Sequence, residues 1–477
     1  MRKLRPCHEN LIAVFFQTMK ACGAIAAAVF LVTTATSGAE DGLRVGSASC
    51  ELAADDSMVI GGGIGPGAAR GQEGKLRAVA TVMELPGESP EKPPRRAAII
   101  ACDILMIARD YLDHAAGMIE EELGIPFDSI LINATHTHHA PTTVTIHGYE
   151  RDEAFCERVR DAIVCAARKA SERLGDGSSS RARLHFRLGE ESSVGQNSRL
   201  LLGDGTIFWI GPREDEVRPT GPFDPDLPVL AFRRASSGYE SVIFGHSTHL
   251  IGCREAGKRS PGFYALAAQD LEPELGGTVT FISGASGSTH NLELRCDEME
   301  RRVRAAVLDA MEKASGAAVT ELRGLRREVT YRVRNFDEEA EDAAVIAYTR
   351  KRCEPGGAER IAEVFRSMRR QLASHRGEER RTWVQALRIG DIAWVGIPGE
   401  CFTRIGIEIK RRSPFRYTFI AGLANDYIGY IPDEPAYALG GYQVWTGLHS
   451  MVEKGTGERL ADTAVELLET LRGERSF

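Results

Sequence analysis

The sequence predicts an α/β protein: a single large domain with central β-sheets flanked by helices. Short apolar runs, typical of buried strands, alternate along the chain with longer amphipathic segments, typical of helices. No internal repeat or long low-complexity linker interrupts the 477 residues, and only short turns separate the elements. We therefore expect one domain from about residue 45 to residue 475.

The expected strands are apolar runs bounded by turn residues. They cover residues 77–84, 96–107, 129–133, 229–232, 240–244, 279–282, 325–333, 385–389, 393–397 and 417–423. Two pairs are expected to form hairpins, one around Ser236-Ser237-Gly238 and one around Gly390-Asp391, because these residues favour tight turns.

The expected helices are longer periodic segments. They cover residues 109–124, 153–173, 263–271, 298–314, 337–375 and 457–471. The first ends at Gly124, before Ile125-Pro126, and the second is stopped by Gly175-Asp176-Gly177. The segment 337–375 is rich in charge, and we expect a long solvated helix there.

The first residues carry the pattern of an export signal. Lys20 precedes an apolar run over 21–32, and small residues follow as far as Ala39. We expect a signal peptide over 1–39, cleavage near Ala39–Glu40, and a secreted or periplasmic domain over 40–477. The alternative is an uncleaved anchor, although the run is shorter than the ~20 residues of a membrane span. A net charge of −8 without a basic stripe argues against nucleic acid as a partner.

Eight cysteines follow the expected signal peptide, and none of them forms a Cys-x-x-Cys motif. A zinc ribbon is therefore not expected. Export permits disulfides. Cys102 and Cys165, however, sit in apolar segments, and we expect both to be buried thiols.

The most informative segment runs from Ile130 to Pro141, where an apolar run ends in three histidines. His136 and His138 are two residues apart, and side chains at that spacing on an extended backbone point to the same side. Two crowded imidazoles are costly to bury unless something binds them, and zinc, copper, iron or nickel would suit them. The alternative is a pair of polar histidines on a surface turn.

Three more residues of metal-binding type follow expected strands. His246 lies in Gly-His-Ser-Thr-His, Glu400 in Pro-Gly-Glu, and Tyr430 in Asn-Asp-Tyr-Ile-Gly-Tyr. Taken singly, each has a structural explanation: a hydrogen-bonded histidine, a charge that complements a helix N-terminus, and a packed tyrosine.

The order and context of these motifs resemble the neutral/alkaline (non-lysosomal) ceramidase family, in its N-terminal catalytic domain, from about residue 61 to residue 471. The matching segments are Thr135 to His138 (the family's THTHSGP), Asp224 to Phe232 (DPxxxVLRF), Gly390 to Glu400 (GD…PGE) and Asn425 to Tyr442 (NxYxxY…NYE).

The resemblance implies a zinc site and hydrolysis of an amide. The implied metal ligands are His136, His246, Glu400 and Tyr430, together with a water. The implied catalytic residues are His138, which would shuttle a proton or hold the oxyanion, Arg199, the active-site arginine, and Tyr442, which would hydrogen-bond the substrate carbonyl. The implied substrate is a small lipid-like molecule, with ceramide as the default, and peripheral contact with a membrane is expected from it.

One loop departs from the family pattern. The family's GDxSPN loop, with a serine important for activity, is here Gly284 to Asn291, and Ser288, Thr289 or His290 stands in that space. The family's C-terminal immunoglobulin-like domain is also not expected in this chain. Three functions therefore compete: a zinc enzyme that cleaves a ceramide-like lipid, a zinc hydrolase of a different amide or ester, and a non-catalytic homologue.

Overall fold

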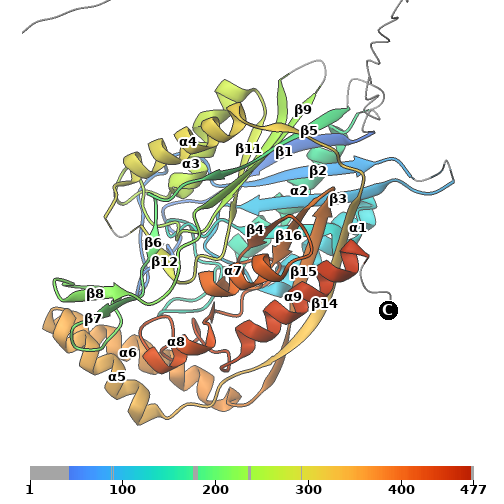
Figure 1. Ribbon diagram of the computed structural model, residues 1–477. Helices are drawn as coiled ribbons and strands as arrows, with labels where there is room; N and C mark the ends of the chain where they lie inside the picture. The colour runs from blue at the N-terminus through green and yellow to red at the C-terminus, as the bar shows by residue number, and fades with distance from the viewer. Residues whose placement is uncertain are drawn as a thin grey trace, which may run out of the picture. The chain divides into compact units, whose positions relative to one another are not determined.

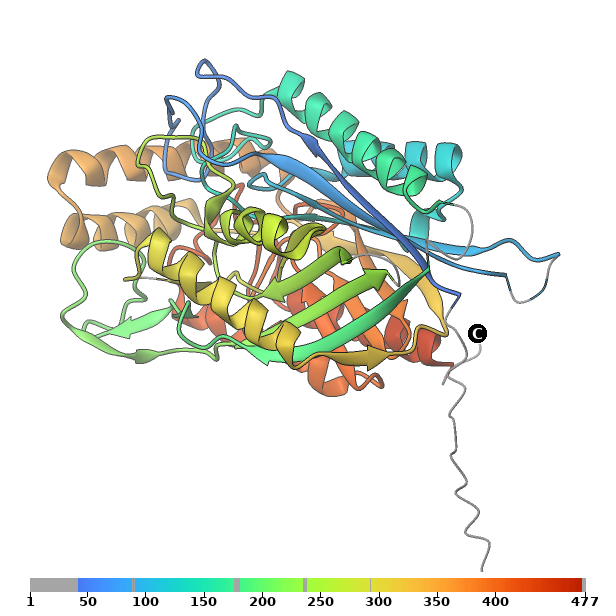
Figure 2. The same cartoon turned by 90° about the horizontal axis from the view of Figure 1, so that it is seen from above.

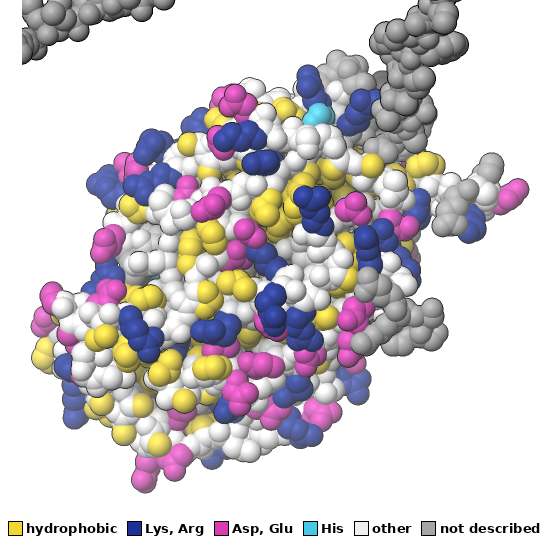
Figure 3. Space-filling model, viewed as in Figure 1, with side chains coloured by type: hydrophobic (Ala, Val, Ile, Leu, Met, Phe, Trp, Pro, Cys, Tyr) yellow, Lys and Arg dark blue, Asp and Glu magenta, His cyan; other side chains and the backbone are white. Residues whose placement is uncertain are grey.

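The computed structural model describes residues 42–87, 89, 91–175, 181–234, 238–291 and 293–473. The expected signal peptide, residues 1–39, lies outside the described residues. The face in Figure 3 mixes acidic and basic side chains with scattered apolar ones. No helix in the described ranges has the length and apolar character that a membrane crossing requires.

Three β-sheets of four or five strands form the centre of the described chain (Figures 1 and 2). The first has the order β1-β2-β3-β4, which are Arg44–Glu51, Arg77–Leu85, Arg95–Cys102 and Ile130–Ala134. The second has the order β11-β10-β9-β5-β13, which are Thr278–Ser283, Tyr239–His246, Asp226–Arg234, Ala182–Glu190 and Ser315–Ala317. The third has the order β14-β15-β16-β18, which are Leu322–Arg332, Glu379–Ile389, Ile392–Gly396 and Tyr417–Ala421.

The three sheets share one inner core, and a helix pair covers each outer face. Ile99 of the first sheet, Leu230 and Ile243 of the second, and Leu387 and Trp394 of the third belong to one buried cluster. The covering helices are α1 (Arg109–Leu123) and α2 (Glu153–Glu172), α3 (Gly262–Leu275) and α4 (Cys296–Glu312), and α7 (Thr403–Arg412) and α9 (Thr456–Arg472). Burial of apolar sheet faces on both sides drives this arrangement. The expected α/β fold with helix-flanked sheets is confirmed.

Three two-stranded sheets complete the described strands. They pair β17 (Glu400–Cys401) with β19 (Tyr430–Ile431), β12 (Thr289–His290) with β6 (Gln196–Asn197), and β7 (Leu200–Leu202) with β8 (Glu216–Pro219). The first pair places Glu400 opposite Tyr430.

A buried asparagine joins the strand ends of all three main sheets. Asn133, in β4, accepts a hydrogen bond from the Ser283 N–H at the end of β11 (3.0 Å) and donates to the carbonyl of Gly422, just after β18. Buried amides must be satisfied in this way. The loops that leave these strands are therefore held close to one another.

The long helix expected over 337–375 is wrong. The chain forms α5 (Glu338–Arg352), α6 (Pro355–Leu372) and a 3₁₀ turn at Ala373–His375. Pro355 explains the break: it has no N–H to continue α5, and it suits the first turn of α6. The strand expected over 96–107 also ends early, at Cys102.

One of the two cysteine expectations is wrong. Cys165 forms a disulfide with Cys50, which ties α2 to β1 with a sequence separation of 115. Cys102 is a buried free thiol, as expected. An apolar helix face explains the error, because it buries a cysteine equally well as a thiol or as half of a cystine.

A buried carboxyl just after β3 gives stability a pH dependence. Asp103 accepts a hydrogen bond from the Arg77 backbone N–H (3.0 Å), and burial raises the pKa of Asp103 to about 7. In the unfolded chain this carboxyl ionises near pH 4, so unfolding between about pH 4 and 7 releases a proton. Its contribution to stability is complete below about pH 4 and is lost as the pH rises through about 7.

Between about pH 5 and pH 7 the wild type becomes less stable as the pH rises. We expect Asp103→Asn to reduce this pH dependence of the free energy of unfolding. Urea unfolding at several pH values measures this slope. Asp391→Asn, at an exposed turn, is the matched control and should keep the wild-type slope. Identical slopes in wild type and Asp103→Asn would contradict the assignment.

Candidate metal centre

Three histidines meet just beyond the end of β4. The His136 Nε2 atom lies 3.0 Å from His249 Nε2 and 3.3 Å from His138 Nε2. One nitrogen from each ring lies within 4.8 Å of the others. His136 and His249 are buried, and His138 is partly exposed.

Backbone carbonyls orient all three rings. The Nδ1 atoms of His136, His138 and His249 each lie 2.9 Å from a carbonyl oxygen, which belongs to Leu105, Gly62 and Ser286 respectively. A carbonyl can only accept, so each Nδ1 carries the proton and each neutral ring directs its Nε2 lone pair into the cluster. Three lone pairs that face one another repel, and a cation between them would remove that repulsion.

A carboxylate and a phenol adjoin the histidines. Glu400 Oε2 lies 3.3 Å from His136 Nε2 and 3.3 Å from His249 Nε2, and the Tyr430 hydroxyl lies 3.3 Å from His249 Nε2. The Tyr427 hydroxyl donates to the other carboxylate oxygen, Oε1 (3.2 Å). Glu400 Oε2 is buried without a hydrogen-bond partner among the described residues.

This donor set fits a zinc ion. Zinc binds imidazole and carboxylate at about 2.0–2.2 Å, and tetrahedral geometry then spaces the ligand atoms about 3.3–3.6 Å apart. The 3.0–3.3 Å separations among His136, His249 and Glu400 are close to that spacing. A cation held by His136, His249 and Glu400 would satisfy the unpartnered Oε2 and remove the repulsion between the two histidine lone pairs.

The charge states agree with such a site. Burial, and then the nearby imidazoles, hold the pKa of His138 well below its ordinary value, so its ring stays neutral. Burial and the charge of Glu400 raise the pKa of Tyr430 well above its ordinary value.

The histidine pair meets by a different route from the one expected. β4 ends at Ala134, and His136 has a φ of 73°, in the left-handed region, so no extended strand runs from His136 to His138. The two rings still meet edge to face, with centroids 4.8 Å apart. Gly62, with a φ of 108°, makes room: a Cβ there would lie 2.7 Å from the His138 Cβ.

The structure does not bring His246 to the cluster. Its Nε2 lies 2.8 Å from the Glu191 carbonyl, and its Nδ1 is bonded to the Tyr264 hydroxyl, so both ring nitrogens already have partners. The strand expected to stop at residue 244 runs on through His246, which pairs with Ser283 inside the sheet. His249, three residues later, has left the strand and takes the place expected for His246.

The second tyrosine, Tyr442, is held between two rings close to Tyr430. It stacks on Trp209 with centroids 4.5 Å apart and planes 2° apart, and on His449 with centroids 5.1 Å apart. Its hydroxyl lies 3.3 Å from His147 Nε2, and burial lowers the pKa of His147 to about 4. The partly exposed Tyr442 ring lies 5.7 Å from the Tyr430 ring.

Arg199 binds the segment that carries Tyr442. Its buried guanidinium donates to Gln443 Oε1 (2.9 Å) and to the Gly440 carbonyl (2.7 Å). Burial lowers the pKa of Arg199 to about 10, which leaves it charged. The described contacts therefore place Arg199 as a residue that holds the Tyr442 segment in position.

In the loop over 284–291, the three residues that could stand in the space of the family's serine have different surroundings. Ser288 accepts from the Thr403 N–H (3.1 Å) at the start of α7, and Thr289 donates to the Ser247 carbonyl (2.7 Å). His290 stacks beside His249, with ring centroids 6.1 Å apart, and burial lowers its pKa to about 3. Of the three side chains, that of His290 therefore adjoins the metal centre.

The fold is shared with solved ceramidase structures. The crystal structure of neutral ceramidase from Pseudomonas aeruginosa matches with a TM-score of 0.68 over 91% of this chain and 75% of that chain, at 18% identity. A ceramidase complexed with C2 matches with a TM-score of 0.68 over 91% of this chain and 76% of that chain, at 17% identity. No family model and no curated protein matches the sequence. At these identities the likeness establishes the fold, which is the one that the motif resemblance implied.

Proposed function

We propose that this chain is a zinc-dependent amidohydrolase that cleaves the N-acyl amide bond of ceramide or a ceramide-like lipid. The observation that carries the proposal is the cluster of Nε2 atoms of His136, His138 and His249, in which those of His136 and His249 each lie 3.3 Å from the unpartnered Oε2 of Glu400. The neutral ceramidase fold supports the choice of an amide as the bond that is cleaved.

The proposed ligands are His136, His249 and Glu400, with Tyr430 beside them. Zinc, when bound, would act as a Lewis acid that lowers the pKa of water and so makes it nucleophilic near neutral pH. His138, whose neutral Nε2 faces the cluster, would accept a proton from the attacking water and return it to the leaving amine. Tyr442, fixed between Trp209 and His449, would donate to the carbonyl oxygen as negative charge develops on it.

The proposed setting is export into an oxidising compartment, where the Cys50–Cys165 disulfide would be stable. We further propose a lipid-like small molecule as the partner at this site, delivered by peripheral contact with a membrane. Hydrolysis of a different amide or ester remains the second candidate, because the loop over 284–291 departs from the ceramidase pattern.

The decisive experiment measures the metal content of the purified protein and then the release of fatty acid from a short-chain fluorescent ceramide. Zinc near one equivalent, together with ceramide turnover that a chelator abolishes, would support the proposal. A parallel assay with the matching ester separates the two hydrolase candidates. Zinc-free protein that turns over ceramide would refute the proposed mechanism.

We expect Tyr442→Phe to lower kcat by about 10²-fold while zinc content is unchanged, because it removes one donor to the developing oxyanion and no metal ligand. Zinc content and steady-state kinetics on the same sample test this. Tyr111→Phe, on α1 with its hydroxyl on Glu153, is the control and should retain wild-type kcat. An unchanged kcat in Tyr442→Phe would remove this tyrosine from the mechanism.

A further inference from the structure

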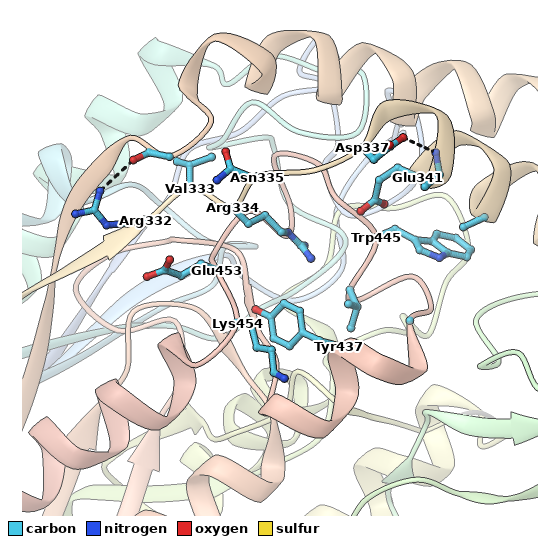
Figure 4. Close-up of a pocket in the computed structure, with 15 residues that line it drawn as sticks. Arg332, Val333, Arg334, Asn335, Asp337, Glu341, Tyr437, Trp445, Glu453 and Lys454 are labelled. Carbon is cyan, nitrogen blue, oxygen red and sulfur yellow. Dashed lines mark hydrogen bonds between the residues drawn. The ribbon is translucent and has the colours of Figure 1, made fainter.

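A cavity of about 610 Å³ lies between helix α5, helix α8 (Glu434–Leu439) and the chain that follows β14 (Figure 4). None of its lining residues belongs to the proposed zinc site. Its apolar wall consists of Val333, Ala340, Ala344, Tyr437, Val444 and Trp445. Its volume is sufficient for a small organic ligand.

One guanidinium in this cavity lacks an anionic partner. Figure 4 shows the Arg334 side chain reaching in between Tyr437 and Trp445. Its Nη2 donates to the Ser450 hydroxyl (2.7 Å) and carbonyl, while its Nε is buried without a partner. No carboxylate of the described residues lies within 4.0 Å of this guanidinium. Burial also lowers the pKa of Arg334, as expected for a poorly solvated cation.

The other charged side chains of the cavity are already engaged. Glu341 accepts from the Thr446 N–H (3.0 Å) and hydroxyl (2.6 Å), and Asp337 accepts from the Ala340 N–H (2.9 Å). The remaining ones form ion pairs: Glu453 with Arg459 (2.9 Å), Arg332 with Glu379 (2.9 Å) and Lys454 with Glu434 (2.8 Å). Among the described residues, Arg334 is thus the basic side chain of this cavity that forms no ion pair with a carboxylate.

We propose that this cavity binds a monocarboxylate that carries an apolar chain. The carboxylate would lie on the Arg334 guanidinium, whose planar donors match a carboxylate, and the chain would lie against Val444, Trp445 and Ala344. The acid that amide hydrolysis would release has this chemistry, and only that identification rests on the proposed function.

The cavity and the metal centre share a structural segment. Gly440, Val444 and Trp445 line the cavity, while Tyr442, between them in sequence, faces the metal centre. The Ser450 hydroxyl, which accepts from Arg334, donates to the Gln443 carbonyl (2.9 Å). A carboxylate bound to Arg334 would therefore be linked, through the hydrogen bonds of Ser450, to the segment that carries Tyr442.

Calorimetry with octanoate tests the proposal on the full-length protein. Octanoate should bind more tightly than octylamine or octanol, which have the same chain without the negative charge. Arg334→Gln should weaken octanoate binding by about tenfold or more, because it removes a charge-assisted pair. Arg332→Gln, at the rim and already paired with Glu379, is the matched control and should bind octanoate as the wild type does.

Ala344→Glu gives a second test that does not depend on replacing a buried residue. Ala344 is an exposed helical position on α5 that lines the cavity, so a glutamate there is tolerated by the helix and repels an anion. Unchanged octanoate affinity in both Arg334→Gln and Ala344→Glu would overturn the proposal, as would equal binding of octylamine.

The His136→Ala variant separates this site from the metal centre. Octanoate binding that persists in His136→Ala supports the cavity, whereas binding that disappears places octanoate on the zinc and overturns the proposal. A wild type that binds octanoate at Arg334 but hydrolyses no ceramide would refute the proposed function and leave this site standing.

Discussion

Zinc should be lost from the His249→Ala variant and kept by the His246→Asn variant. His249 directs its Nε2 at His136 and Glu400, whereas both nitrogens of His246 are bonded to Glu191 and Tyr264. Loss of a partner that merely orients a ligand costs roughly 10–100-fold in metal affinity, and loss of the ligand itself should cost more. His136→Ala and Glu400→Ala should therefore also lose both zinc and turnover.

Metal analysis after dialysis against a chelator, followed by the ceramide assay, measures both effects on one sample. His114→Ala, at an exposed position of α1, controls for the loss of an imidazole anywhere on the protein. The opposite pattern, with zinc kept by His249→Ala and lost by His246→Asn, would show that the motif order outweighs the geometry. Full activity in a zinc-free His136→Ala protein would end the zinc assignment.

Loss of the Cys50–Cys165 disulfide should destabilise the protein by about 2–5 kcal/mol. The bond closes a loop with a sequence separation of 115, so breaking it releases much conformational entropy in the unfolded chain. Guanidinium unfolding of the Cys50→Ala/Cys165→Ala double variant measures the change in the free energy of unfolding. The expected result is a lower midpoint without loss of the α/β circular dichroism spectrum.

Reduction supplies the internal control. Dithiothreitol should lower the unfolding midpoint of the wild type toward that of the double variant and leave the double variant unchanged. Cys353→Ser, which replaces a partly buried free thiol, should have nearly the wild-type stability. A wild type that is indifferent to dithiothreitol, and equal in stability to the double variant, would show that the disulfide does not form.

The sequence predicted most, but not all, of the side chains that the structure brings together here. The motifs grouped His136, His138, Glu400 and Tyr430, and the structure brings their side chains together. The choice of His246 failed because the end of a strand cannot be fixed within two residues from an apolar run. His249, in the same Gly-His-Ser-Thr-His motif, was the available alternative.

The fold was predictable where local signals agree with packing. The hairpin of β15 and β16 turns at Gly390-Asp391, as expected, because glycine there adopts a φ of 62°. The strand β5 was missed, since Arg183, His185 and Arg187 interrupt its apolar pattern. The pairing of Glu400 with Tyr430 could not be foreseen either, because two-residue strands leave no periodicity to detect.

The carbonyl oxygens that orient the three imidazoles belong to the main chain, and every residue type has one. Replacement of the Leu105 or Ser286 side chain therefore leaves these acceptors in place, and only Gly62 is restricted, by its own backbone. The orientation of the three rings is consequently set by the backbone conformation and not by the neighbouring side chains. Homologous chains can drift far apart in composition around such a centre and still aim their nitrogens at the same point.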